Sequence, residues 1–175
     1  MAKTIYLAGG CYWGVEKYMS CLPGVMETEV GFANGRTEAP TYRQVCDEDT
    51  GHAETVRVVF DETVMPLRKL LRLFFRIIDP VSVNRQGGDV GEQYRTGIYT
   101  LSEADESIAR AELERLQGRY EAPLAVECCP LASFWPAEEY HQKYLDKNPG
   151  GYCHVPLKAI REAAQTAMLP EDDLP

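Results

Sequence analysis

The sequence predicts an α+β fold, a ferredoxin-like two-layer sandwich in which helices pack against a mixed sheet and long loops carry the functional groups. Two observations indicate this class. Apolar residues alternate in several short runs, as in strands, and recur at helical spacing in others. These runs follow the order β-α-β-β-α-β, with an additional helix and strand. Because the 175 residues contain no repeat or linker, we expect a single domain over 1–175, with a core at about 4–155 and a C-terminal tail at 156–175.

The first half of the chain is predicted to hold three strands and one helix. The helix begins at Cys11, directly after two glycines, and its apolar residues Val15 and Met19 lie one turn apart. A long segment before the third strand is rich in Gly, Pro, Asn, Thr and Asp, which is typical of a functional loop. The strands are expected at 4–8, 25–32 and 52–60, the helix at 11–20 and the loop at 33–51.

The second half is predicted to add two longer helices and two strands. Pro66 opens the clearest helix, whose apolar stripe ends at Asp79-Pro80. Ser102 is a good N-cap for the next helix, and we expect its apolar stripe to reach Tyr120. Strands are expected at 94–101 and 124–129, polar loops at 81–92 and 148–153, and a short helix within 134–145, where Phe134, Trp135, Tyr140 and Tyr144 are expected to belong mainly to the core.

Composition and charge exclude several classes of protein. Eighteen basic against 27 acidic residues give a net charge of −9, which argues against a nucleic acid as partner. No apolar run is long enough for a membrane span, and the N-terminus does not resemble a secretory signal. We therefore expect a cytoplasmic protein without a membrane partner, in which the acidic residues 171–173 form a solvated end.

The cysteines and histidines do not indicate a structural framework. Six cysteines, without a C-x-x-C pair, are expected to be mostly free thiols in a reducing compartment. The three histidines, at positions 52, 141 and 154, are too scattered in sequence to indicate zinc ligation, although His154 is placed to influence Cys153. We therefore expect no metal.

Cys11 is the most informative thiol, because it stands where a strand becomes a helix, within Gly9-Gly10-Cys11-Tyr12-Trp13-Gly14. Unpaired N–H groups and the helix dipole at this position favour the thiolate, which is the nucleophilic form. Tyr12 and Trp13 are expected to wall a small apolar pocket beside the sulfur. Taken alone, the cysteine fits a buried structural residue in a tight turn better than a nucleophile.

Six motifs, in order along the chain, resemble those of the A-type peptide methionine sulfoxide reductases. Each motif alone is weakly specific, but six in register between Tyr6 and Cys153 are strongly specific. They are Gly10-Cys11-Tyr12-Trp13-Gly14, Tyr42-Arg43-Gln44-Val45-Cys46, Gly51-His52-Ala53-Glu54, Asn84-Arg85-Gln86-Gly87, Asp89 to Arg95 and Asn148 to Cys153. The resemblance implies that the S epimer of methionine sulfoxide, free or in proteins, is reduced to methionine.

The resemblance also implies roles for two groups at the reacting centre. Cys11 matches the family's nucleophile, which attacks the sulfoxide sulfur. Glu54 matches the family's acid, which protonates the departing oxygen. Strand alternation places Glu54 on the same face as Val56, Val58 and Phe60, and such an apolar setting raises a carboxyl pKa by desolvation.

Five further residues match the family's substrate pocket. Tyr42 and Tyr94 match two tyrosines whose hydroxyls bind the sulfoxide oxygen. Asp89 matches an aspartate that helps to order the pocket, and Tyr12 and Trp13 would hold the S-methyl group. Tyr12 replaces the family's usual phenylalanine, and this difference affects the expected pocket shape and substrate preference more than the reaction type.

Cys153 matches the family's resolving position, where a second thiol condenses with the sulfenic acid of Cys11 to form a disulfide. By residue type alone, the cysteines at positions 21, 46, 128 and 129 are alternatives. Because no cysteine follows Cys153, we expect a single resolving step. The resemblance implies that thioredoxin, or dithiothreitol in vitro, then supplies the reducing equivalents without a metal or flavin cofactor.

Two other functions fit an activated cysteine. A thiol peroxidase would use Cys11 on a peroxide, and a redox sensor would use its oxidation to change a partner surface. A sensor has no need for a buried acid beside its thiol, so Glu54 argues against that function. We expect a monomeric enzyme that repairs oxidised methionine during oxidative stress.

Overall fold

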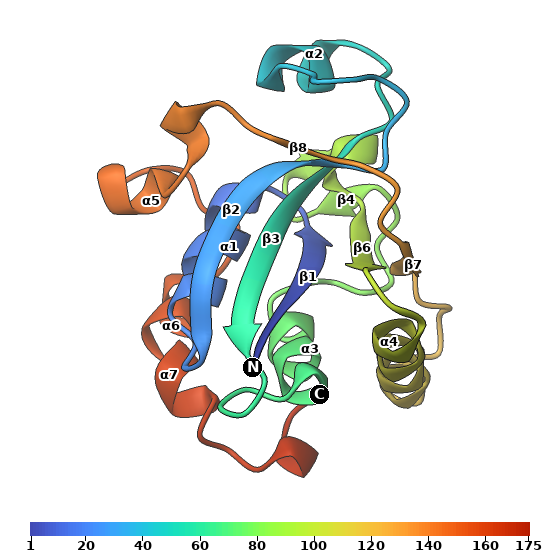
Figure 1. Cartoon of the computed structure of the whole chain (residues 1–175), viewed down its shortest axis with the longest axis vertical. Coiled ribbons are helices and arrows are strands. Elements are labelled where there is room, and N and C mark those ends of the chain that lie inside the picture. Colours follow the sequence, from blue (N-terminus) through green and yellow to red (C-terminus); the bar gives the residue numbers. More distant parts are fainter.

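A twisted six-stranded sheet runs through the centre of the computed structural model, which describes all residues, 1–175 (Figure 1). The strand order is β7-β6-β1-β3-β2-β8, and every neighbouring pair is antiparallel except β6 and β7. The four central strands with the helices after β1 and β3 form the β-α-β-β-α-β unit that the sequence predicts. The strands are β1 (Ala2–Gly9), β2 (Val25–Ala33), β3 (Ala53–Asp61), β6 (Thr96–Thr100), β7 (Glu127–Pro130) and β8 (Phe134–Pro136), with a separate hairpin of β4 (Arg85–Gln86) and β5 (Asp89–Val90).

The longer helices pack on one face of this sheet, which confirms the two-layer arrangement (Figure 1). Shorter helices lie at the ends of the sheet and along the C-terminal segment. None of the helices is long and apolar enough to cross a bilayer. The helices are α1 (Tyr12–Ser20), α2 (Tyr42–Asp47), α3 (Leu67–Phe75), α4 (Glu103–Gln117), α5 (Tyr144–Lys147), α6 (Leu157–Arg161) and α7 (Ala163–Thr166), with 3₁₀ turns at Glu92–Tyr94, Glu139–His141 and Glu171–Asp173.

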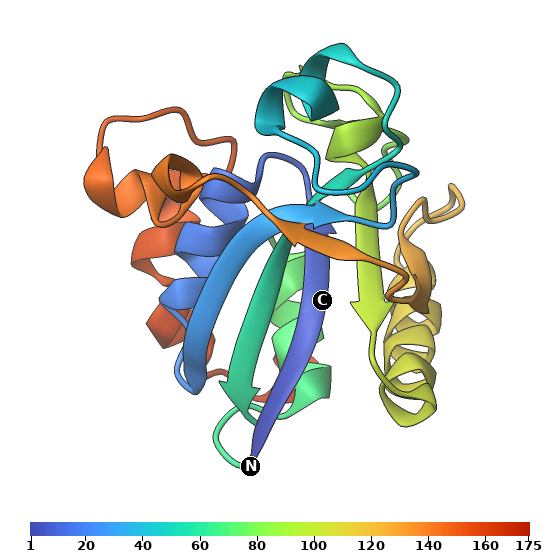
Figure 2. The ribbon, with the colours of Figure 1, turned by 45° about the horizontal axis from the view of Figure 1, so that its top comes forward.

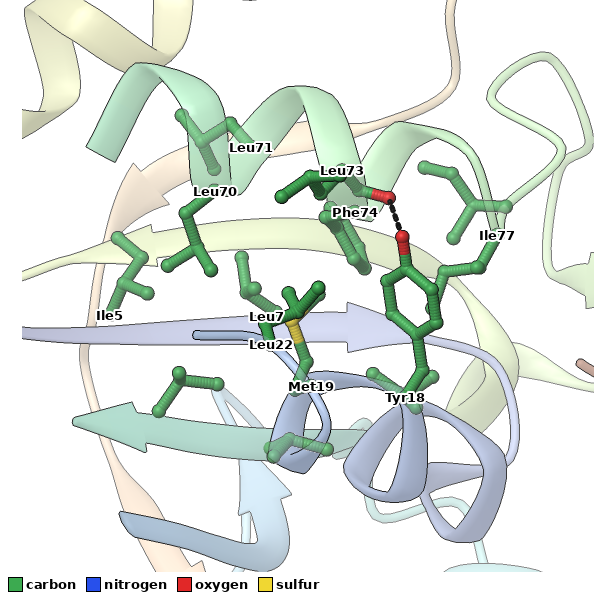
Figure 3. Close-up of a cluster of buried hydrophobic side chains, with 14 of the residues drawn as sticks. Ile5, Leu7, Tyr18, Met19, Leu22, Leu70, Leu71, Leu73, Phe74 and Ile77 are labelled. Carbon is green, nitrogen blue, oxygen red and sulfur yellow. Dashed lines mark hydrogen bonds between the residues drawn. The ribbon is translucent and has the colours of Figure 1, made fainter. Parts of the chain in front are cut away.

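Strand alternation explains which face the helices cover. Ile5 and Leu7 of β1 lie opposite Val58 and Val56 of β3, and all four side chains are buried on the helical side. Met19 of α1 lies between the sheet and α3 (Figure 3). The other face carries a smaller apolar cluster, which the chain around β7 and β8 covers without a helix.

A tyrosine hydroxyl links two of the packed helices. Tyr18 of α1 is buried beside α3, and its hydroxyl donates a hydrogen bond of 3.1 Å to the carbonyl oxygen of Leu73 (Figure 3). The bond satisfies the one polar atom that this aromatic side chain takes into the core. It thereby fixes α1, and with it the first residues of the motif around Cys11, relative to α3.

Several predicted elements and boundaries were wrong. The loop at 33–51 contains α2, and the loop at 81–92 contains the β4–β5 hairpin. The helix after Pro66 ends at Phe75, because the next N–H groups bond three residues back and tighten the last turn. The last main strand begins at Glu127 and not at 124, and Tyr120 lies beyond α4 and is partly exposed.

The segment at 156–175, which we expected as a C-terminal tail, folds against the core. It forms α6, α7 and a 3₁₀ turn, and Ala163, Ala167 and Leu174 are buried in the main core. Arg72 of α3 donates a 2.8 Å hydrogen bond to the carbonyl oxygen of Glu171. The small apolar residues at helical spacing therefore bury this segment, although the Asp172 side chain remains 99% exposed.

Candidate active site

The predicted site lies at the end of the sheet where β1 ends and α1 begins, with α2 and the β4–β5 region beyond the same end (Figure 2). Cys11 precedes the first residue of α1 and is 7% exposed. Gly10 has φ +89°, and a Cβ there would lie 2.7 Å from the Cβ of Gln86. The turn that presents the thiol therefore requires glycine, both for its backbone angle and for the close approach of β4.

Glu54 lies directly beside the nucleophile's backbone. It stands in β3 on the helical face, opposite Phe32 of β2, and is 1% exposed. The N–H of Tyr12 donates a 3.2 Å hydrogen bond to Oε1 of Glu54, and Oε2 is buried without a partner. Burial raises the pKa of Glu54 to about 8, against the lowering effect of the Tyr12 N–H. The carboxyl is therefore mostly protonated at neutral pH, as an acid catalyst requires.

The thiol of Cys11 is not activated at rest, in contrast to the expectation from its helix position. Burial raises the pKa of Cys11 above its usual range, the charge of Glu54 raises it further, and the N–H of Trp13 lowers it. Desolvation of the thiolate thus outweighs the stabilisation that the helix N-terminus offers. The buried position therefore favours the thiol form of Cys11 over the thiolate.

Tyr42 and Tyr94 gather around the same carboxyl. Burial raises both hydroxyl pKa values, and Glu54 is the next cause in each case, which places both rings near its charge. Tyr42 is the first residue of α2, whose start is held by a capping box between Thr41 and Gln44. The two hydroxyls remain protonated and can donate hydrogen bonds to one oxygen atom.

Asp89 connects the pocket to the C-terminal loop. The hydroxyl of Tyr152 donates a 2.9 Å hydrogen bond to Oδ2 of Asp89 in β5. The charge of Asp89 also contributes to the raised pKa values of Cys11 and Glu54, so it lies near both. Asp89 therefore faces the reacting centre and at the same time holds the loop that carries Cys153.

The two aromatic residues after Cys11 differ in position. The Tyr12 ring is fully buried against Phe32, with ring centroids 5.7 Å apart, and its hydroxyl has no partner. The Trp13 ring is half-buried and stacks on Tyr144 at 3.7 Å and 12°. Trp13 is therefore the accessible aromatic wall, whereas Tyr12 supports it from within.

His141 belongs to this aromatic group and was not predicted as a site residue. Its Nδ1 accepts a 3.1 Å hydrogen bond from Nε1 of Trp13, and its ring lies 4.3 Å from that of Tyr42. Burial lowers its pKa, which agrees with a neutral ring that accepts at Nδ1. The aromatic residues that surround His141 in the sequence were the signal that could have indicated its role. Tyr140, which we expected in the core, is exposed.

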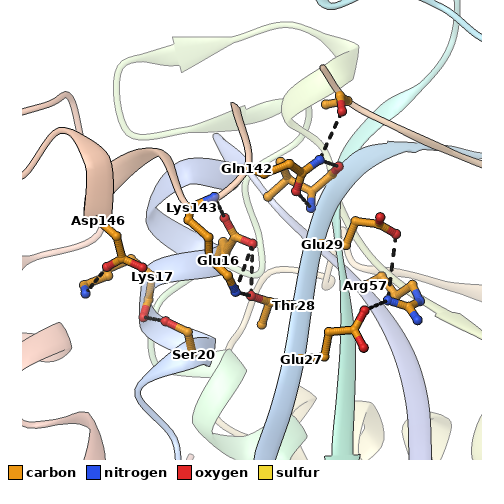
Figure 4. Close-up of polar contacts among 12 residues, drawn as sticks. Glu16, Lys17, Ser20, Glu27, Thr28, Glu29, Arg57, Gln142, Lys143 and Asp146 are labelled. Atoms are coloured by element: carbon orange, nitrogen blue, oxygen red, sulfur yellow. Dashed lines mark hydrogen bonds and ion pairs between the residues drawn. The ribbon is translucent and has the colours of Figure 1, made fainter. Parts of the chain in front are cut away.

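A polar network anchors Gln142 and Lys143, the two residues that follow His141 in the chain (Figure 4). Glu16 of α1 accepts hydrogen bonds from the Thr28 hydroxyl at 2.9 Å and from the Lys143 N–H at 2.7 Å. Lys143 has a positive φ of 53°, so the chain turns sharply between His141 and Tyr144. The helix that presents Cys11 therefore also orients the aromatic segment against Trp13.

Cys153 lies against the first turn of α1. A Cβ at Gly14 would be 3.0 Å from Sγ of Cys153, which shows how closely the loop approaches the helix. Sγ donates a 3.2 Å hydrogen bond to the carbonyl oxygen of Val155, and no cysteine is paired in a disulfide. Cys21 follows the far end of α1, whereas Cys46 is exposed on α2 beside Tyr42.

The remaining predicted groups lie apart from this site. Cys128 and Cys129 stand in β7 on the edge of the sheet. Three or more His, Cys, Asp or Glu side chains nowhere come together in a way that could hold a metal ion. His154, by contrast, lies beside the site: its Nε2 donates a 2.9 Å hydrogen bond to the carbonyl oxygen of Gly9, which holds the loop to the turn before Cys11.

Comparison with known proteins agrees with this geometry. The sequence profile of the family described as "Peptide methionine sulfoxide reductase" matches residues 3–172. "Peptide methionine sulfoxide reductase MsrA" of Lachnoclostridium phytofermentans is 59% identical over 155 residues, which cover 89% of this chain and 93% of the relative.

Solved structures similar to this chain include two of the yeast protein Mxr1. A crystal structure of Mxr1 from Saccharomyces cerevisiae in reduced form has a TM-score of 0.83 and 40% identity, and the match covers 87% of this chain and 88% of that chain. A structure of Mxr1 in complex with Trx2 has a TM-score of 0.58 and 27% identity, with 82% and 84% of the two chains covered.

Proposed function

The chain belongs to the peptide methionine sulfoxide reductase family and is an oxidoreductase that reduces methionine sulfoxide, and from this premise we propose that it acts on the S epimer, free or in proteins. The observation that carries the mechanism is the hydrogen bond from the Tyr12 N–H to Glu54, because it sets a protonated carboxyl beside Cys11. Cytoplasmic location and a monomeric state are part of the same proposal and rest on the sequence alone.

The sulfoxide oxygen binds among three donors. Protonated Glu54 and the hydroxyls of Tyr42 and Tyr94 supply hydrogen bonds at the point where negative charge develops on oxygen. The S-methyl group lies against the Trp13 ring. As the oxygen is hydrogen bonded, positive charge grows on the substrate sulfur, which favours loss of the Cys11 proton despite the buried setting.

Oxygen transfer then leaves a sulfenic acid on Cys11. The sulfur of Cys11 attacks the substrate sulfur, Glu54 gives its proton to the oxygen, and the thiol proton returns to Glu54. The oxygen then moves to the Cys11 sulfur, and both the S–O bond of the substrate and the bond between the two sulfurs break. Methionine leaves reduced by two electrons, and the Cys11 sulfur is oxidised by two.

Cys153 resolves the sulfenic acid. The Cys153 sulfur attacks the Cys11 sulfur, the S–O bond of the sulfenic acid breaks as a disulfide forms, and the hydroxyl leaves as water with the proton of the Cys153 thiol. Its position against Gly14, one turn along the helix from Cys11, supports this role over the cysteines at the other end of α1 and in β7. A protein dithiol of the thioredoxin kind then reduces the disulfide, and the complex of the yeast relative with Trx2 supports this reductant. The electrons come from thiols, so the proposal involves no metal or flavin.

Epimer selection follows from the fixed positions of three groups. A sulfoxide sulfur is chiral. In the pocket, its methyl group must contact Trp13, its oxygen must contact Glu54, and the rest of the substrate must point to the open side. With the sulfur facing Cys11, one epimer satisfies all three contacts, whereas the other exchanges the oxygen and the methyl group. The exchanged arrangement places a methyl group at Glu54 and leaves the donors unpaired, which costs binding energy.

The test uses the separated epimers of a methionine sulfoxide peptide with dithiothreitol. Wild type should form methionine from the S epimer, and Cys11→Ser should form none. Absence of methionine from both epimers would contradict the proposal, and product from the R epimer alone would contradict the epimer assignment. Faster turnover of hydrogen peroxide than of the sulfoxide would favour a thiol peroxidase instead.

A further inference from the structure

An apolar groove of about 240 Å³ opens beside Cys153 and is lined by residues of α1, α5 and α6. Leu145, Leu157 and Ile160 give it an apolar wall, and Lys17 with Asp146 supplies the only charged pair in its lining. The Leu157 side chain is 59% exposed although it is a large apolar residue. The groove includes Cys153 but not Cys11, Glu54 or the tyrosines, so it adjoins the substrate pocket without being part of it.

The groove lies on the side of Cys153 that faces away from Cys11. Along α1, Cys11 comes first, Gly14 contacts Sγ of Cys153, and Lys17 lines the groove. These three positions follow one another in steps of three residues, which is about 4.5 Å of helix each at 1.5 Å per residue. Cys153 is therefore level with the middle position, and the groove continues the direction from Cys11 to Cys153.

That direction matters for the chemistry of disulfide reduction. A thiolate that displaces one sulfur from another approaches opposite to the leaving sulfur, through a mixed disulfide. In the disulfide of the proposed cycle, Cys11 is buried and Cys153 is the reachable sulfur. A reductant that attacks Cys153 with Cys11 as the leaving group must therefore arrive from the groove.

We propose that this groove is the docking site for the thiol-bearing edge of a protein dithiol of the thioredoxin kind. The proposal rests on the function proposed above and names the surface on which that reductant binds. The apolar wall accepts apolar residues beside the partner's thiol, and the ion pair of Lys17 with Asp146 adds polar groups at the edge of this wall.

The thiol–disulfide exchange transfers two electrons from the partner to this chain and needs no other reactant. The partner's thiolate bonds to Sγ of Cys153, the bond between Cys153 and Cys11 breaks, and its electron pair goes to Cys11, which takes up a proton. The partner's second thiol then displaces Cys153 and closes the partner's own disulfide. The partner loses two electrons, and both cysteines of this chain become thiols.

The first experiment places a charge in the groove. Leu157→Glu should raise the KM for thioredoxin by at least about tenfold with a fixed peptide substrate, because a buried carboxylate opposes apolar docking. The rate with dithiothreitol should stay within about twofold of wild type, since the small dithiol needs no docking surface. Val64→Glu is the matched control, because Val64 is 57% exposed and lies outside the groove.

The outcomes separate this proposal from the function on which it rests. An unchanged KM for thioredoxin in Leu157→Glu would overturn the docking site, and so would an equal fall of both rates. Loss of sulfoxide reduction with dithiothreitol in wild type would instead overturn the proposed function. Leu157→Ser, a milder change at an exposed position, should show a smaller rise in KM and guards against misfolding of the first variant.

A trapping experiment identifies the attacked sulfur. Thioredoxin that lacks its second cysteine should form a mixed disulfide with the oxidised wild-type protein, and peptide mapping should place the bond on Cys153. Leu157→Glu should lower the trapped yield, and Val64→Glu should not. A mixed disulfide on Cys11, or self-association of two copies through the groove in place of trapping, would contradict the proposal.

Discussion

The backbone N–H of Tyr12 donates a 3.2 Å hydrogen bond to Oε1 of Glu54, although the two residues are 42 positions apart in the chain. Tyr12 is the first residue of α1 and follows the nucleophile directly, so this one bond ties the acid in β3 to the turn that carries Cys11. The bond stabilises the ionised carboxyl, yet burial dominates, and the pKa of Glu54 lies at about 8.

Replacement of Glu54 by glutamine should remove acid catalysis and keep the fold. The amide oxygen of Glu54→Gln can still accept the Tyr12 N–H, but the side chain cannot give a proton to the sulfoxide oxygen. The rate of methionine formation with dithiothreitol should fall by about 10²- to 10⁴-fold. Single-turnover kinetics measure this step, and a rate within about threefold of wild type would show that another group is the acid.

The pH dependence of stability should reveal the buried carboxyl. The pKa of Glu54 rises from 4.5 to about 8 on folding, so the folded state binds the proton more tightly than the unfolded state. Below pH 4.5 both states are protonated, and as pH rises towards 8 the contribution of Glu54 to stability is lost. Glu54→Gln should therefore gain stability relative to wild type between pH 5 and 8. Urea unfolding at several pH values tests this, and a difference that does not change with pH would contradict it.

Tyr12→Phe should stabilise the protein. The Tyr12 hydroxyl is buried without a partner, and an unsatisfied buried hydroxyl costs about 1–3 kcal/mol. Tyr18→Phe is the matched control, because the Tyr18 hydroxyl donates to the Leu73 carbonyl oxygen and its loss should destabilise by about 0.5–1.5 kcal/mol. Urea unfolding of both variants gives the two free energies. Destabilisation by Tyr12→Phe would mean that its hydroxyl has a partner in solution.

Gly14→Ala should slow the resolving step. The added Cβ would lie 3.0 Å from Sγ of Cys153 and 3.0 Å from Cγ2 of Val155, so the loop must shift away from α1. The first methionine should form at the wild-type rate, whereas disulfide formation should slow by about tenfold. Trapping of the sulfenic acid over time measures the second step. At Gly118, the control position, an added Cβ meets only the Arg115 carbonyl oxygen at 3.4 Å, and Gly118→Ala should leave both steps unchanged.

Much of the fold was predictable because its elements carry strong periodicity. Alternation in β3 placed Glu54 among apolar residues on the buried face, and the structure confirms this. The errors fell on segments whose order depends on distant contacts. α2 lies in a polar stretch and is anchored where Glu138 accepts the Tyr42 N–H, and the C-terminal segment is helical because it packs against Arg72 and the main core.

The sequence by itself determined the family and predicted the nucleophile and the acid, because both depend on motifs whose residues are neighbours along the chain. Only the tertiary structure decided that Cys11 rests as a thiol, that His141 supports Trp13, and that Cys153 lies against Gly14. The physical reason is that desolvation and side-chain contact depend on groups from elements far apart in sequence. A helix N-terminus favours a thiolate locally, but here the surrounding core opposes it more strongly.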